Sequence, residues 1–166
     1  HHLSDATVLT KNDLILLDFG ARVNGYCADM TRVVFIGKPK DEWVRAYDTV
    51  MEAQKNAVAY LASCSRPGLE FRASGAKLDR LARAKIKSSG FEPYSHGLGH
   101  GVGLDIHEAP RLNYKKDALL KTGMVFSVEP GIYLPGRYGI RIEDLVRLTD
   151  TGIRVMTRSP KTIIIL

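Results

Sequence analysis

The spacing of hydrophobic and polar positions predicts both helices and strands along the 166-residue chain. Across residues 41–63, apolar side chains recur mainly at three- and four-residue steps, which predicts an amphipathic helix that ends at Arg66-Pro67-Gly68. A second helix is expected over residues 73–88, with Gly90 as its stop. Its predicted inward side chains are Leu78, Leu81, Ala82 and Ile86.

The rest of the chain carries short apolar runs separated by glycine, as β-strands do. Leu14-Ile15-Leu16-Leu17 ends at Asp18, which predicts a buried strand with an acidic residue at its end. Asn24-Gly25 is a strong hairpin signal, so residues 26–35 should return antiparallel with Asp29 in the second strand. Further strands are predicted in segments 97–107, 124–129, 132–134, 140–148 and 162–166.

In this arrangement, Glu129 ends one strand and Glu143 lies inside another. Helices packed against a curved antiparallel sheet give an α+β architecture. No repeat, low-complexity tract or linker interrupts the chain, so residues 1–166 are predicted to form one domain. The apolar fraction of 45% is ordinary for a soluble globular protein.

Composition and charge narrow the classes of function. No apolar run approaches the roughly 20 residues that span a bilayer, and no signal-peptide pattern opens the chain, so a cytoplasmic protein without membrane contact is predicted. The net charge of +6 comes from scattered basic residues, which favours a solvated surface over nucleic-acid binding. Two cysteines, Cys27 and Cys64, are too few for a disulfide scaffold.

Candidate metal ligands recur along the chain. They comprise four oxygen donors and one imidazole: Asp18, Asp29, His100, Glu129 and Glu143. A site so rich in carboxylates suits two divalent cations that share bridging oxygens, and such a pair can activate water for hydrolysis. The predicted hairpin brings the two aspartates close together. A hydrolase is therefore the leading interpretation.

The stretch from His96 to Glu108 adds three histidines within twelve residues, at positions 96, 100 and 107. Glycines at alternating positions would let the backbone pass close to a ligand or metal. One histidine alone is more often a surface or core residue than a ligand. Three in a glycine-rich strand, with four carboxylates elsewhere, favour a functional site.

These segments resemble the catalytic domain of the pita-bread metallopeptidases, the family of aminopeptidase P, prolidase and methionine aminopeptidase. The segments that carry the resemblance are Asp18-Phe19-Gly20, Gly25–Arg32, His96–Glu108, Val128-Glu129-Pro130-Gly131 and Arg141-Ile142-Glu143-Asp144. They occur in the family's order and cover nearly the whole chain. The resemblance implies the pita-bread fold, with the amino-terminal part of the domain missing here and an apolar face of the sheet exposed as a result.

The resemblance also implies roles for the ligands. Asp18 would bind one metal, Asp29 and Glu143 would bridge both metals, and His100 with Glu129 would complete the second site. A hydroxide between the metals would attack the scissile carbonyl, and Glu129 would relay the proton. Manganese is expected on ligand hardness, with cobalt, zinc and iron as alternatives.

Four further residues are carried over as catalytic candidates. His96 and His107 would contact the substrate or the tetrahedral intermediate. His1 stands seventeen residues before Asp18, where these peptidases place a substrate-binding histidine, although the pair His1-His2 could also be a tag remnant. Arg141 could hold a carboxylate of the substrate or form an ion pair with Glu143 or Asp144.

Within the family, His96 and Arg141 favour the Xaa-Pro branch over methionine aminopeptidase. The implied reaction is hydrolysis of the bond between an amino-terminal residue and proline in a small peptide. Two other interpretations stay open: a non-catalytic binding module of the same fold, which typically loses several ligands, or an inactive piece of a longer enzyme. A homodimer is the family's expectation.

Overall fold

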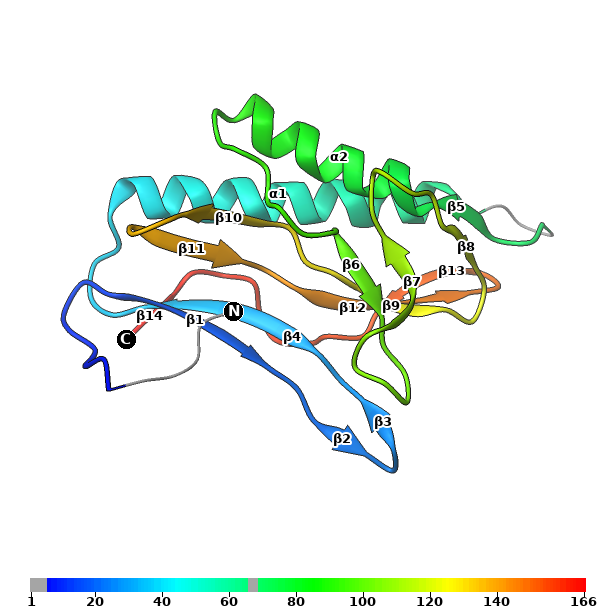
Figure 1. Ribbon diagram of the computed structural model, residues 1–166, viewed down its shortest axis with the longest axis horizontal. Helices are drawn as coiled ribbons and strands as arrows, with labels where there is room; N and C mark the ends of the chain where they lie inside the picture. Colours follow the sequence, from blue (N-terminus) through cyan, green and yellow to red (C-terminus); the bar gives the residue numbers. More distant parts are fainter. Residues whose placement is uncertain (1–5, 66–68) are drawn as a thin grey trace.

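The computed structural model describes residues 6–65 and 69–166, in which two helices pack against curved β-sheets (Figure 1). The helices are α1 (Asp41–Ser63) and α2 (Gly75–Ser88). The strands are β1 (Leu14–Phe19), β2 (Arg22–Val23), β3 (Tyr26–Cys27), β4 (Met30–Phe35), β5 (Arg72–Ser74), β6 (Gly99–Gly101), β7 (Glu108–Leu112), β8 (Leu119–Lys121), β9 (Val125–Val128), β10 (Gly131–Leu134), β11 (Tyr138–Arg141), β12 (Asp144–Thr149), β13 (Gly152–Val155) and β14 (Ile164–Ile165).

Two sheets carry the fold. One has five strands in the order β13-β12-β9-β6-β7, and every pairing in it is antiparallel. The other has the order β1-β4-β14, in which β14 runs parallel to β4. Figure 1 shows α1 and α2 side by side over one face, while the ribbon that continues from β1 and β4 into β2 and β3 projects away from them. The predicted α+β class is confirmed.

The hydrophobic core lies between the helices and the sheets. The inward face of α1 presents Trp43, Tyr47 and Leu61, all buried, and the rings of Trp43 and Tyr47 lie 6.2 and 5.9 Å from the ring of Phe35 on β4. Burying a large apolar side chain contributes on the order of 2 kcal/mol. This packing fixes α1 against the strand that leads into the site.

The helix predictions hold with one correction. Helix α1 has the predicted bounds, while its expected terminator at 66–68 lies outside the described residues. Helix α2 begins at Gly75 because Ser74 caps it by accepting a hydrogen bond from the backbone N–H of Lys77, and the residues before it form β5. Gly90 follows the helix with a positive φ of 83°, as expected of a terminating glycine.

Three strand predictions are wrong in detail. The run Leu14–Leu17 was predicted to be buried, but β1 is half-buried to exposed, with Leu17 41% exposed. Asp29 lies in the short break between β3 and β4, and Glu143 lies between β11 and β12, so neither carboxylate sits inside a strand. The Asn24-Gly25 turn is confirmed, with both residues at positive φ. Neither helix of the described residues is long and apolar enough to cross a membrane.

The alternating glycines leave room for the backbone of neighbouring strands. A Cβ on Gly99 would lie 1.9 Å from the carbonyl oxygen of Ser127, and one on Gly101 would lie 2.1 Å from that of Ala109. Any side chain at either position would collide with an adjacent strand. Glycine therefore lets the neighbouring strands approach the backbone closely on either side of His100, and the approach of a ligand to this backbone stays a prediction.

Candidate metal and active site

The first pair of candidate ligands comes from the β1–β4 hairpin. Asp18 pairs in register with Thr31, and Gly20 approaches the carbonyl of Ala28 so closely that a Cβ there would lie 1.9 Å from its oxygen. This close approach brings Asp29 to the same side as Asp18. The side chain of Asp18 is 37% exposed, whereas that of Asp29 is 12% exposed.

The second pair comes from the five-stranded sheet. His100 is the middle residue of β6, and Glu129 directly follows β9. Nε2 of His100 lies 3.2 Å from Oε1 of Glu129 and 3.8 Å from Oδ2 of Asp29. Between the strands, the Ser127 hydroxyl accepts from the His100 backbone N–H at 3.0 Å and donates to Oε1 of Glu129 at 3.0 Å. The hydroxyl therefore fixes this pair.

Glu143 joins the two pairs. Its backbone N–H donates to the carbonyl of Thr31 at 3.2 Å, and the Thr31 hydroxyl donates to its Oε2 at 2.6 Å. The residue is 1% exposed, and its other oxygen, Oε1, has no hydrogen-bond partner among residues 6–65 and 69–166. A buried carboxylate oxygen without a donor is costly unless a cation or another donor reaches it.

The electrostatics of the cluster are those of crowded carboxylates. Burial, and then the charge of Glu129, raises the pKa of Glu143 to about 8. Burial and the neighbouring Asp18 also raise the pKa of Asp29. Burial alone would raise the pKa of Glu129. The hydrogen bond and charge of His100, together with the hydrogen bond from Ser127, outweigh burial and lower that pKa. The acidic groups therefore repel one another unless positive charge lies between them.

These donors fit divalent cations. Three groups each place one ligand atom per residue within 4.8 Å of one another: Asp18, Asp29 and Glu143; His100, Glu129 and Glu143; and Asp29, His100 and His107. The first two groups share Glu143 and together contain all five predicted ligands. A set with one imidazole and several carboxylate oxygens suits hard to borderline divalent metals. The unpartnered oxygen of Glu143 is the atom that such an ion would satisfy.

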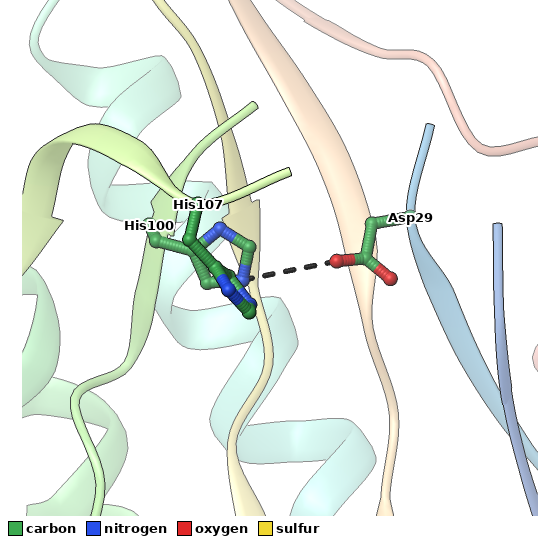
Figure 2. Close-up of side chains that lie close together, drawn as sticks. All are labelled: Asp29, His100 and His107. Atoms are coloured by element: carbon green, nitrogen blue, oxygen red, sulfur yellow. Dashed lines mark ion pairs between the residues drawn. The ribbon is translucent and has the colours of Figure 1, made fainter. Parts of the chain in front are cut away.

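The third group adds His107, which was not predicted as a ligand. Figure 2 shows the imidazoles of His100 and His107 together, facing the carboxylate of Asp29 from the opposite side. The two rings meet edge to face with centroids 4.3 Å apart. His107 is exposed on the loop between β6 and β7, so it lies at the rim of the cluster.

A cavity of about 600 Å³ opens beside the ligands. Its wall includes the expected residues His96, His107 and Arg141 together with His100 and Glu129. A pocket of this size can hold a small organic ligand such as a short peptide. His1, the remaining catalytic candidate, lies outside the described residues.

His96 is held in one tautomer. Its Nδ1 lies 2.6 Å from the carbonyl oxygen of Gly97, which can only accept, so Nδ1 carries the proton. Its Nε2 then accepts from the Tyr133 hydroxyl at 2.9 Å, and that hydroxyl accepts from the Arg141 guanidinium at 3.2 Å. Burial lowers the pKa of His96, so the ring is neutral at neutral pH.

Arg141 makes a different ion pair from those considered in the sequence. Its guanidinium contacts the carboxylate of Asp18 and donates to the Thr31 hydroxyl at 3.0 Å. Asp144 is instead bound by Arg32, whose guanidinium donates to Oδ1 of Asp144 at 2.7 Å and to the carbonyl of Glu143 at 2.6 Å. Arg141 therefore lies between the carboxylates of Asp18 and Glu129, and Arg32 anchors the backbone of Glu143.

Several residues of the site gave no sequence signal that would single them out. The Ser127 hydroxyl joins His100 to Glu129, the Thr31 hydroxyl joins Glu143 to Arg141, and the Tyr133 hydroxyl joins His96 to Arg141. Threonine, serine and tyrosine are ordinary strand residues, and their spacing marks no motif. Thr31 and Ser127 lie within two residues of predicted ligands, and that proximity was the available clue.

Fold and site together define a class. A curved antiparallel sheet that places an imidazole and four carboxylates beside a small pocket suits metal-assisted hydrolysis. The sequence matches Metallopeptidase family M24 over residues 1–150. The chain belongs to this family of metallopeptidases.

Individual relatives show which members of the family the chain is similar to. The chain is 39% identical to an Xaa-Pro dipeptidase of Pyrococcus furiosus over 165 residues, which cover 99% of this chain and 45% of that protein. It is 36% identical to an Xaa-Pro dipeptidase of Lactobacillus delbrueckii subsp. lactis, covering 100% of this chain and 43% of that one. The chain thus spans less than half the length of these relatives.

Solved structures agree on the fold. A prolidase from Thermococcus sibiricus superposes with a TM-score of 0.92 at 38% identity, over 100% of this chain and 43% of that one. An X-Pro aminopeptidase from Thermotoga maritima gives 0.86 at 40% identity, over 98% and 44%. A methionine aminopeptidase from Rickettsia prowazekii gives 0.75 at 17% identity, over 91% and 66%, and that likeness concerns the fold alone. The predicted pita-bread fold, with part of the protein absent from this chain, is confirmed.

Proposed function

We propose that the protein that contains this chain is an Xaa-Pro peptidase that uses two divalent metal ions. The observation that carries the proposal is the convergence of two ligand groups on Glu143, whose buried Oε1 lacks a partner among the described residues. The relatives named as Xaa-Pro dipeptidases support the choice of substrate. The substrate would be a small peptide with proline at the second position.

The five ligands would hold the metals as two groups. Asp18 would serve one ion, called the outer ion, and His100 with Glu129 the other, called the inner ion. Asp29 and Glu143 would serve both, because Asp29 groups with Asp18 and also with His100. When bound, the metals lower the pKa of a water, which makes it a nucleophile for a peptide carbonyl near neutral pH. Manganese is the proposed metal because oxygen donors predominate.

The protein's own residues would handle the proton and the substrate. Oε2 of Glu129 lies 3.8 Å from Nε of Arg141, while Oε1 is occupied by His100 and Ser127. Oε2 is therefore the atom available to take up a proton and pass it to the departing amine of proline. His96 and His107, on the wall of the same cavity, would contact the peptide. A homodimer and a cytoplasmic location remain predictions.

A peptide panel tests the proposal. The natural full-length chain, loaded with manganese, is assayed on an Xaa-Pro dipeptide, an Xaa-Pro tripeptide and a Met-Ala peptide. We expect hydrolysis of the proline peptides only, abolished by a chelator and reduced by on the order of 10²- to 10⁴-fold in Glu129→Gln. Cleavage of Met-Ala with the proline peptides intact would refute the assignment, as would full activity in the presence of chelator.

A further inference from the structure

A second cluster of charged and aromatic side chains lies outside the ligand set. Asp79 and Arg83 are one turn apart on α2, and Tyr94 follows the helix in the segment that leads to β6. The Asp79 carboxylate is fully buried, and its Oδ1 accepts from Nε of Arg83 at 2.9 Å and from the Tyr94 hydroxyl at 2.7 Å. Its Oδ2 accepts from the backbone N–H of Tyr114 at 2.8 Å.

Arg83 connects this cluster to the wall of the substrate cavity. Its guanidinium lies between two aromatic rings, 4.2 Å from the ring centre of Tyr94 and 4.5 Å from that of Tyr114. The two nitrogens not bound to Asp79 donate to backbone carbonyls, one to Tyr94 at 2.7 Å and the other to His96 at 2.5 Å. Only a planar guanidinium can hold a carboxylate and two carbonyls while it stacks between rings.

His96 is the residue that this arrangement fixes. Arg83 binds its backbone, and the ring of Tyr94 stacks on its imidazole with centroids 4.8 Å apart and planes 26° from parallel. His96 lines the cavity, whereas Asp79, Arg83 and Tyr94 do not. A buried ion pair adds little net stability compared with apolar packing. The pair of Asp79 and Arg83 is better explained by the orientation that it imposes.

We infer that Asp79, Arg83 and Tyr94 form a positioning unit that holds His96 in its orientation at the wall of the substrate cavity. The catalytic consequence rests on the proposed peptidase function, but the orientation of His96 does not. All three are positioning residues, because they act on the substrate through His96. Tyr133 holds Nε2 of the same ring from the opposite element, β10.

Nuclear magnetic resonance tests the orientation without any assay of activity. The ring signals of His96 are assigned in the full-length protein by their loss in His96→Ala. We expect Arg83→Met to shift these signals toward those of an unstacked imidazole. Lys85→Met is the control, because Lys85 lies on the same helix but pairs with Glu52 of α1, and it should leave them unchanged.

A second variant tests the same inference if Arg83→Met does not fold. Arg83→Lys keeps a charge beside Asp79, but a lysine cannot reach both carbonyls, so it should produce the same shift. His96 signals that stay at their wild-type positions in Arg83→Met, or in Arg83→Lys where the first variant is unfolded, would overturn the inference.

A double-mutant cycle tests the catalytic consequence. We expect Arg83→Met to lower kcat/KM by about ten- to a hundredfold with two metals still bound, the range for a displaced contact in an active site. In the His96→Ala background, Arg83→Met should cause no further loss, because both changes remove the same interaction. Equal losses in both backgrounds would overturn the inference. A wild-type protein without activity would instead refute the proposed function and leave the resonance result to stand.

Discussion

The two halves of the ligand set differ in how firmly the protein holds them. On the inner half, His100, Glu129 and Glu143 lie on or beside strands of the five-stranded sheet, and Ser127 and Thr31 bind them in place. On the outer half, Asp18 lies in the β1–β4 hairpin with its side chain 37% exposed. Glu143, in contrast, is 1% exposed.

The difference concerns where positive charge comes from. The carboxylate of Asp18 is paired with Arg141, a residue of the protein. The inner carboxylate Glu143 has one oxygen bound by Thr31 and the other unpartnered among the described residues. Glu143 therefore has an oxygen free to receive a cation, whereas Asp18 is already paired with a cation of the protein. We expect the inner ligands to dominate metal affinity.

Glu143→Gln should have the largest effect on metal binding, because it removes the carboxylate that both ligand groups share. We expect the variant to lose stoichiometric binding of two manganese ions, measured by isothermal titration calorimetry. It should also lose nearly all peptidase activity. Wild-type stoichiometry and affinity in the variant would show that Glu143 is not a shared ligand.

The same substitution has a pH signature in metal-free protein. Glu143 releases its proton near the ordinary pKa of 4.5 when unfolded, but burial raises the folded pKa to about 8. The folded state thus loses stability as pH rises from about 4.5 to 8, and the loss is complete above that range. With chelator present, the Tm of Glu143→Gln should fall less over this interval than that of the wild type. Parallel curves would contradict the assignment.

Asp18→Asn probes the outer half and should have a smaller effect. We expect the affinity for the weaker of the two metal ions to fall by at least about a hundredfold, because Asp18 is a proposed ligand and even the groups that support ligands are worth about ten- to a hundredfold. The affinity for the tighter ion should change little, because His100 and Glu129 are untouched. Calorimetry distinguishes the two steps, and equal losses in both would remove the contrast between the halves.

Thr31→Val should have the smallest effect of the three. Valine keeps the shape but removes the hydroxyl that donates to Glu143 and accepts from Arg141. The loss of such a supporting group typically lowers metal affinity by about tenfold to a hundredfold, and we expect the lower end because the Glu143 backbone stays anchored by Arg32. Thr31→Ser, which keeps the hydroxyl, serves as the control and should bind metal as the wild type does.

The sequence predicted the ligands better than their supports. Aspartate, glutamate and histidine stand out among short apolar strands, and their segments carry the family resemblance, so all five proposed ligands were named in advance. Thr31, Ser127 and Tyr133 were missed because hydroxyl residues are common in strands and their roles depend on long-range pairing. Glu143 was placed inside a strand because Ile142 precedes it and Leu145 follows soon after, which hides the break that lets it reach Thr31.

The hydrogen bond from Thr31 to Glu143 joins residues 112 positions apart in the chain. Contacts of such long sequence separation form late in folding, because the loop that they close is entropically expensive. The shared ligand position is thus completed only when the β1–β4 sheet has docked against the strands around Glu143. Metal uptake by this protein should therefore follow collapse of the chain. The time course of manganese binding during refolding would then report when the β1–β4 sheet docks.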